Sequence, residues 1–170
     1  MKLCVTHCTK DKRDGVLPPC LLYDSLRIDC FTAYCKERGL KWAILSAKYG
    51  LFFPEEKGEK YDVTFKKPEE GYWLGIQVVE NGKGLCRNQS DMRLAGLAET
   101  VADQISQRSV DKIVYYYGDD PQKPRPEGYL ALLHYVIDKC DTTHSWDELL
   151  ECTANHGTVH VTKQLDFEQS

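Results

Sequence analysis

The sequence predicts an α/β fold, namely a single three-layer αβα domain with a mostly parallel central sheet. Three short apolar runs, Leu3–His7, Trp42–Leu45 and Lys112–Tyr117, are typical of buried strands. Segments with apolar residues at helical spacing follow the first run and flank the third. Strands that alternate with helices favour a parallel sheet covered on both faces, because parallel strands need long crossover connections.

Three helices are expected between and after these strands. The first starts near Asp24 or Ser25 and ends at Gly39, a residue type that commonly follows a helix. The second is capped by Ser90 or Asp91 and has an apolar stripe formed by Leu94, Leu97, Ala98, Val101 and Ile105. The third follows a proline-rich connector and carries Tyr129, Leu132, Leu133, Val136 and Ile137.

The length and composition indicate one domain. A chain of 170 residues that is 42% hydrophobic can bury a substantial core, so we expect a single domain over residues 1–170. An irregular excursion at about 52–90 is expected to contain an edge hairpin, with Asn81-Gly82-Lys83-Gly84 as a turn. A small helix, capped by Ser145, and a strand at Gly157–Thr162 form a C-terminal appendage at about 141–170.

The charge of the chain limits its partners. A formal net charge of −4 and a pI near 5.7 argue against a broad basic surface for non-specific DNA binding. The lysines and arginine that follow the strands form either a local basic patch or an ordinary solvated surface. They are Lys10, Lys12, Arg13, Lys48, Lys57, Lys60, Lys66 and Lys67. No export signal or membrane span is recognisable, so we expect a cytoplasmic protein without a membrane partner.

Polar residues follow each predicted strand. Ser46, Lys48 and Tyr49 emerge where the second strand stops, and Tyr61-Asp62 can return toward the same edge. Ligands bind at the carboxyl ends of strands in open α/β sheets, which makes this edge the candidate site. Expected catalytic residues are Lys48, Asp62 and Ser46. Expected ligand-binding residues are Cys8, Lys10, Lys12, Tyr23, Ser25, Arg27, Tyr49, Tyr61 and Asp119. Asp119 and Asp120 alternatively form only a turn before Pro121.

One segment resembles a known group of domains. The run ILSAKYGLFFPEEKGEKYD, Ile44–Asp62, resembles the Leu-Ser-Ala-Lys-Tyr-Gly-Leu, Pro, Tyr-Asp signature of small uncharacterised prokaryotic domains. The loop Cys8–Lys12 and the segment Leu22–Arg27 are similar to that group's polar loop and helix start, so the resemblance covers about the first 75 residues. More distantly, the chain is similar to the YaaA family of peroxide-stress proteins and to the archaeosine synthase core domain.

These relatives imply a Rossmann-like or uracil-DNA-glycosylase-like fold associated with nucleic acids or modified nucleobases. The loop after the first strand departs from the archaeosine type, because it lacks that family's Pro-Cys-Ser start and its Lys-Pro-Tyr sequence. A covalent lysine mechanism therefore does not carry over from the resemblance.

The eight cysteines are expected to be mostly reduced, because no export signal accompanies them. Residues Cys140, His144, Cys152, His156 and His160 offer possible zinc ligands, although paired Cys-x-x-Cys knuckles are absent.

The function expected from the sequence is a nucleobase-, nucleotide- or nucleic-acid-directed site at the carboxyl ends of the three strands. Two alternatives stay open: a non-catalytic nucleic-acid-binding module, and a cysteine-based metal or redox protein. The sequence names no cofactor, and it leaves open whether the protein is an enzyme and how it oligomerises.

Overall fold

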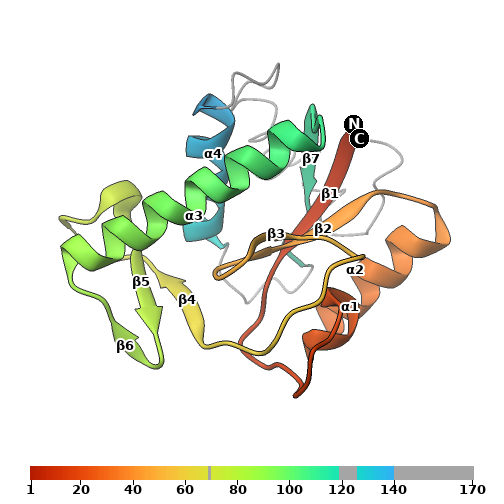
Figure 1. The fold of residues 1–170 in the computed structure, drawn as a ribbon, viewed down its shortest axis with the longest axis horizontal. Helices are drawn as coiled ribbons and strands as arrows, with labels where there is room; N and C mark the ends of the chain where they lie inside the picture. Colours follow the sequence, from red (N-terminus) through yellow and green to blue (C-terminus); the bar gives the residue numbers. More distant parts are fainter. Residues whose placement is uncertain (69, 119–125, 140–170) are drawn as a thin grey trace.

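The computed structural model describes residues 1–68, 70–118 and 126–139. The protein has an α/β fold, in which helices and strands alternate along much of the chain (Figure 1). Its elements are β1 (Lys2–His7), α1 (Pro19–Leu22), α2 (Leu26–Glu37), β2 (Trp42–Ser46), β3 (Gly50–Phe52), β4 (Val63–Lys66), the 3-10 helix η1 (Trp73–Gly75), β5 (Gln77–Glu80), β6 (Lys83–Gly84), α3 (Arg87–Gln107), β7 (Lys112–Tyr115) and α4 (Glu127–Lys139).

The central sheet has the strand order β3-β2-β1-β7. Strand β1 pairs in parallel with both β2 and β7, whereas β3 pairs antiparallel with β2. The residues of these parallel strands are buried almost throughout, as expected for strands covered on both faces. The three predicted strands are therefore neighbours, and their carboxyl ends meet at one edge of the sheet.

A second, antiparallel sheet of order β4-β5-β6 occupies the excursion, where a hairpin was expected. The turn between β5 and β6 consists of Asn81 and Gly82, with φ angles of 53° and 77°. Two successive positive φ angles characterise the type I′ hairpin turn, for which Asn-Gly is a preferred pair. The backbone N–H of Asn81 donates to the carbonyl of Asp62 at 2.8 Å, which anchors the turn beside the start of β4.

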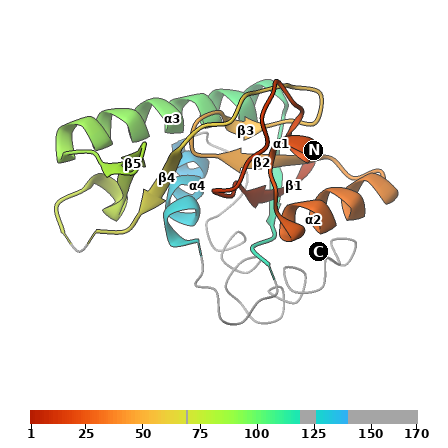
Figure 2. The same cartoon turned by 90° about the horizontal axis from the view of Figure 1, so that it is seen from below.

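Helices α2 and α3 lie on opposite sides of the central strands (Figure 2). Two consecutive tyrosines make different ring contacts: Tyr116 stacks on Phe31 of α2, whereas Tyr115 stacks on His7 of the neighbouring strand β1. Ser25 caps α2, because its hydroxyl accepts a hydrogen bond from the N–H of Ile28 at 3.3 Å. The predicted start of this helix is confirmed.

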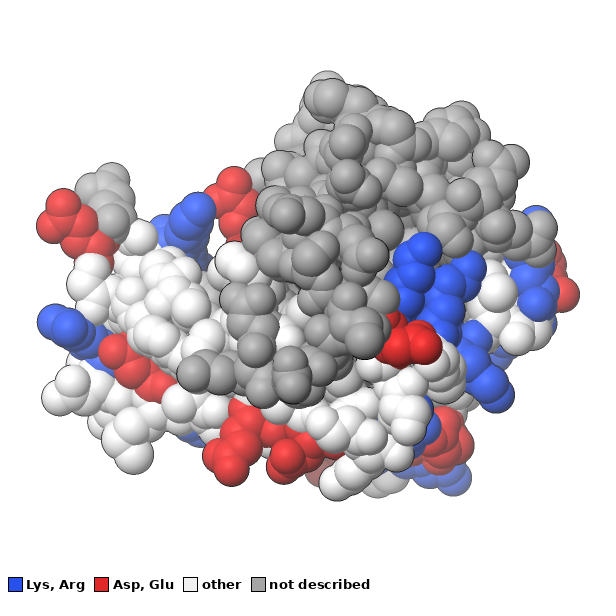
Figure 3. Space-filling view, turned by 90° about the horizontal axis from the view of Figure 1, so that it is seen from above, with Lys and Arg blue, Asp and Glu red and all other residues white. Residues whose placement is uncertain are grey.

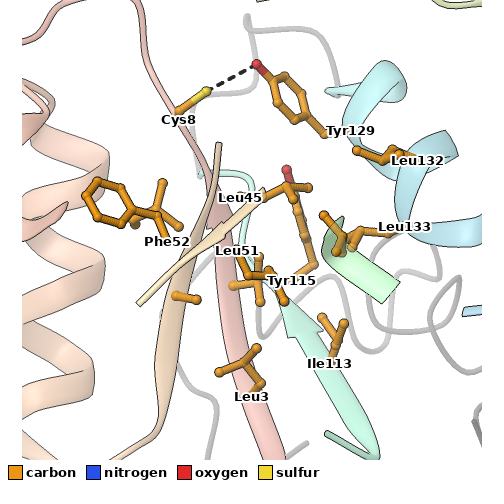
Figure 4. Close-up of a cluster of buried hydrophobic side chains, with 14 of the residues drawn as sticks. Leu3, Cys8, Leu45, Leu51, Phe52, Ile113, Tyr115, Tyr129, Leu132 and Leu133 are labelled. Carbon is orange, nitrogen blue, oxygen red and sulfur yellow. Dashed lines mark hydrogen bonds between the residues drawn. The ribbon is translucent and has the colours of Figure 1, made fainter. Parts of the chain in front are cut away.

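An apolar layer docks α4 onto the central sheet (Figure 4). It consists of Leu3, Leu45, Leu51 and Ile113 from the sheet and Leu132 and Leu133 from α4, and all six side chains are buried. Full burial of one such side chain contributes roughly 1.5–3 kcal/mol. This packing fixes α4 at its position and brings Tyr129 close to Cys8 at the carboxyl end of β1.

The predicted start of α3 is wrong. The helix begins at Arg87 with Cys86 as its N-cap, and Cys86 makes no capping hydrogen bond through its side chain. Ser90 lies inside the helix, fully buried, where its hydroxyl accepts from the N–H of Val78 at 2.8 Å and donates to the carbonyl of Ile76 at 3.4 Å. A polar side chain that resembled a cap instead joins α3 to β5.

Three further comparisons concern β7, β3 and the C-terminal segment. Strand β7 ends at Tyr115, two residues before the predicted end, although the N–H of Tyr116 still donates to the carbonyl of Val5 at 2.8 Å. Strand β3 was not predicted. The expected appendage at 141–170 lies outside the described residues.

The described surface mixes both signs of charge. On the face shown in Figure 3, acidic and basic side chains both occur on the part that is not grey. Whichever face is viewed, charged side chains of the described residues form ion pairs, for example Lys67 with Glu127 and Arg108 with Glu55, each at 2.5 Å. In the part of the chain that the structure describes, no helix is long and apolar enough to cross a membrane.

Candidate functional site

A serine at the end of β2 organises the turn that follows it. The Ser46 hydroxyl oxygen accepts hydrogen bonds from the N–H groups of Lys48 and Tyr49, at 3.1 and 2.9 Å. Because a hydroxyl has two lone pairs, these bonds occupy both, and its proton is donated to the Tyr61 hydroxyl at 2.7 Å. The direction of this hydrogen bond is therefore set by the backbone of the turn.

The hydroxyl chain continues to a second tyrosine. The hydroxyl groups of Tyr61 and Tyr23 lie 2.8 Å apart, and their rings meet edge to face with centroids 6.4 Å apart. Burial raises the pKa of both phenols above their ordinary value of 10.0. Both tyrosines therefore stay protonated at neutral pH and act as hydrogen-bonding groups rather than as bases.

A cavity of about 270 Å³, here called the small pocket, opens between the loop after β1 and the second sheet. Its walls come from three distant parts of the chain: the loop after β1, the β4–β5 region and α4. The lining residues are Cys8, Thr9, Lys10, Lys12, Asp62, Val63, Thr64, Val79, Gly82 and Tyr129. Cationic, anionic, thiol and hydroxyl groups thus share one small space.

Lys12 is the half-buried cation of the small pocket. Its Nζ atom lies 4.1 Å from the centroid of the Tyr61 ring and donates to the carbonyl of Lys10 at 3.3 Å. Burial lowers the pKa of Lys12, and this effect outweighs the opposing influence of Cys8, Asp62 and Asp11. An isolated antiparallel bridge to Tyr23 holds its backbone in place.

Cys8 and Tyr129 form the most buried part of the small pocket, with exposed fractions of 6% and 7%. The Cys8 sulfur and the Tyr129 hydroxyl lie 3.3 Å apart, as Figure 4 shows. Burial raises the pKa of Tyr129 well above its ordinary value, so this hydroxyl also keeps its proton at neutral pH. Next to them, the Tyr115 hydroxyl lies 2.8 Å from Nδ1 of His7.

A larger cleft of about 640 Å³ lies between the Ser46 turn, the second sheet and α3. It shares Asp62 and Val63 with the small pocket. Its other lining residues are Ala47, Lys48, Lys60, Tyr61, Val78, Glu80, Asn81, Met92, Arg93, Gly96, Leu97 and Thr100. The segment Asp62–Val63 is therefore common to both cavities.

The charged side chains of the larger cleft differ in their pairing. Lys60 pairs with Asp14 and Arg93 with Glu80, each at 2.5 Å. Lys48 is exposed, and its Nζ atom lies 5.3 Å from the centroid of the Tyr49 ring. Within the described residues no carboxylate forms an ion pair with Lys48.

The structure distributes the predicted site residues over these features. Cys8, Lys10 and Lys12 line the small pocket, Lys48 lines the larger cleft, and Asp62 lines both. Ser46 and Tyr23 are fully buried and therefore do not line either cavity. Both are linked to the larger cleft through hydrogen bonds to the Tyr61 hydroxyl.

Three other predicted residues make contacts outside both cavities. Ser25 caps α2, and the Tyr49 hydroxyl donates to the carbonyl of Glu59 at 3.0 Å. Arg27 donates to the Thr6 hydroxyl, and burial lowers the pKa of this arginine. Asp119 lies outside the described residues.

Sequence reasoning missed Thr64, Val79, Gly82 and Tyr129 as parts of the small pocket. Gly82 belonged to a predicted turn, but nothing in the sequence placed that turn beside β1. Tyr129 was predicted only as one of several apolar residues on a helix, and nothing in the sequence indicated that its hydroxyl group would line a pocket.

The described residues contain no group of three or more His, Cys, Asp or Glu side chains that could hold a metal ion. The possible zinc ligands Cys140, His144, Cys152, His156 and His160 lie outside the described residues.

A family model matches the segment of the chain that forms most of both cavities. Residues 3–118 match DUF6884, a family of unknown function. The chain belongs to this family. The DUF6884 segment includes every residue of the small pocket except Tyr129. No curated protein and no solved structure matches the chain.

Proposed function

We propose that this DUF6884 protein binds a nucleobase or the base of a nucleotide in the small pocket and acts on it chemically. The observation that carries this proposal is that Lys12 and Asp62, of opposite charge, line one cavity of about 270 Å³ with the buried Cys8 and Tyr129. The pocket lies at the carboxyl end of the parallel strand β1, and the carboxyl ends of such strands are where ligands of α/β proteins commonly bind.

The chemistry of the lining suits a base. A nucleobase presents hydrogen-bond donors and acceptors in one plane, and the pocket offers both kinds of partner. Lys10 and Lys12 donate, Asp62 accepts, and the hydroxyl groups of Thr64 and Tyr129 can do either. The volume lies just below the roughly 300–1,000 Å³ of most small-molecule sites, which favours a compact ring over a whole nucleotide.

Acid–base groups support a chemical role beyond binding. A lysine with a lowered pKa holds a larger share of neutral amine near neutral pH than an exposed lysine does. Asp62 is a carboxylate in the same pocket, so a proton donor and a proton acceptor are available to one ligand.

Ligand-dependent thermal stability tests this proposal. The panel contains free bases, nucleosides and nucleoside monophosphates, measured on the wild type, Lys12→Met, Asp62→Asn and the exposed control Lys57→Met. A ligand at 100 times its Kd stabilises the native state by roughly 2.7 kcal/mol, which is several degrees in Tm. We expect a shift in the wild type and in Lys57→Met that both pocket variants lose; no shift with any of these ligands would contradict the proposal.

A non-catalytic nucleic-acid-binding role is the second candidate, and the larger cleft favours it. Lys48, Lys60 and Arg93 line that cleft, and Lys48 makes no ion pair within the described residues. Under this alternative, oligonucleotide affinity falls steeply with salt. Lys48→Met weakens it, whereas Lys12→Met leaves it unchanged.

The finer structural expectations belong to the same proposal. We also propose a three-layer αβα arrangement and a likeness of the Ile44–Asp62 signature to the YaaA family and the archaeosine synthase core, both of which would favour a nucleobase-directed site. A prokaryotic origin and a cytoplasmic location stay predictions from the sequence. A cysteine-based metal or redox role stays the third alternative, and metal analysis of the purified protein tests it.

A further inference from the structure

The environment of Lys12 differs from that of Lys60 and Lys67. Lys60 and Lys67 are exposed and form ion pairs with Asp14 and Glu127. Lys12 is half-buried, and among the described residues no carboxylate lies within ion-pair distance of its Nζ atom. An ammonium group in this position loses hydration without gaining a close counter-ion.

The contacts of Lys12 hold its Nζ atom in place but do not supply a negative charge to balance an ammonium group. Its Nζ atom lies over the Tyr61 ring and donates one hydrogen bond, to the carbonyl of Lys10. The ring attracts the ammonium form, yet burial lowers the pKa of Lys12 on balance. A neutral amine keeps the hydrogen bond to the carbonyl and gains a free lone pair.

We infer that Lys12 is a nucleophile that captures an aldehyde or ketone group of the ligand as an imine inside the small pocket. This inference rests on the small pocket being the ligand site proposed above, but it does not require the ligand to be a nucleobase. Desolvated lysines are the usual residues for this chemistry, because only the neutral amine attacks a carbonyl carbon.

The reaction balances without a redox partner. The Nζ lone pair forms a C–N bond, the carbonyl π electrons move to oxygen, and this oxygen takes up a proton. The nitrogen then loses a proton, and the hydroxyl group takes up a second proton and leaves as water. The iminium nitrogen that results loses its remaining proton to give the imine. The net products are one imine and one water, with no net change in protons.

Asp62 is the group of the pocket that suits the proton transfers. Its carboxylate lines the same cavity and can take a proton from nitrogen and return it to the leaving oxygen. Tyr129 keeps its proton because burial raises its pKa, so it serves as a hydrogen-bond donor to the carbonyl oxygen.

Reductive trapping with pyridoxal tests the inference. Pyridoxal carries an aldehyde on a flat ring of about nucleobase size, and cyanoborohydride converts its imine into a stable secondary amine. Peptide mapping by mass spectrometry then compares Lys12 with Lys10, Lys48 and Lys57 in the same wild-type protein. We expect most of the label at Lys12, loss of that label in Lys12→Arg and slower labelling in Asp62→Asn.

The wild-type map decides the question even if a variant fails to fold. Label spread over the exposed lysines, with Lys12 labelled no more than they are, would overturn the inference. Nucleobase binding without label at Lys12 would reject the inference and keep the proposed function. Selective label at Lys12 without any nucleobase binding would keep the inference and reject the nucleobase as ligand.

Discussion

The side-chain amide of Gln104 pairs with the main chain of Leu51 as a neighbouring strand would. The N–H of Leu51 donates to Oε1 of Gln104, and Nε2 of Gln104 donates to the carbonyl of Leu51, both at 2.8 Å. Leu51 lies in β3, the edge strand of the central sheet. One side chain from α3 thus occupies backbone groups that would otherwise be open to another strand.

Replacement of Gln104 by alanine is expected to lower the free energy of unfolding by roughly 1–3 kcal/mol, because two backbone groups lose their partners. Urea denaturation measures this change. Gln107→Ala, at an exposed position near the end of the same helix, is the control and should cost little. Equal losses in the two variants would show that the Leu51 contacts contribute nothing to stability.

Gly50→Ala is expected to destabilise the protein more than Gly39→Ala. Both glycines have positive φ, 73° and 62°, so each alanine suffers backbone strain of roughly 1–2 kcal/mol. A Cβ atom at Gly50 would also lie 2.7 Å from Oε1 of Gln104, whereas nothing lies within 4 Å at Gly39. The difference between the two variants in the free energy of unfolding, measured by urea denaturation, gives the cost of the clash at residue 50.

The double variant Gly50→Ala/Gln104→Ala provides an internal check on that clash. Since the shorter side chain removes the obstructing oxygen, the two changes should cost less together than the sum of their separate effects. Strict additivity would argue against the close approach.

Ser46→Ala removes the acceptor of two backbone N–H groups and the donor to Tyr61. We expect a loss of roughly 1–3 kcal/mol in the free energy of unfolding, because these groups lie at a buried position. Chemical denaturation compared with the exposed Ser106→Ala measures it. A loss no larger than that of Ser106→Ala would mean that water replaces the serine without cost.

Alkaline pH should weaken the fold through the buried phenols. Burial raises the folded-state pKa of Tyr23 above 10.0, so the stabilisation is fully present below about pH 10 and is lost as the pH rises toward the folded value. Since lysines also titrate in this range, the measurement is the difference between the wild type and Tyr23→Phe. Unfolding free energies above pH 10 should fall less steeply in Tyr23→Phe; parallel curves would contradict this assignment.

The sequence predicted the central sheet because its strands are uniform apolar runs. Leu3–His7 and Trp42–Leu45 have this character, and their parallel pairing follows from the helix between them. Strand β3 escaped prediction because it has three residues, and its edge is completed by Gln104, which lies 53 positions further along the chain. Nothing local in the sequence indicates such a partner.

The candidate site was only partly predictable for the same reason. The end of the first predicted strand indicated Cys8 and Lys12, because polar residues after an apolar run are visible locally. Asp62 was included because Tyr61-Asp62 can return toward the same edge. The joining of Tyr61 to Ser46 and the approach of Tyr129 to Cys8 depend on how the second sheet and α4 pack. The contrast between a half-buried Lys12 and an exposed Lys48 arises only from that packing.

The small pocket is lined by residues from both sides of the boundary between the two sheets. Cys8 and Lys12 belong to the central sheet's side, whereas Asp62 and Val79 belong to the second sheet, and the two sheets share no strand pairing in the described residues. A ligand that contacts both Lys12 and Asp62 therefore links the central sheet to the second sheet. Ligand binding should therefore slow amide hydrogen exchange along the whole of β4 and β5, including the residues that do not line the pocket.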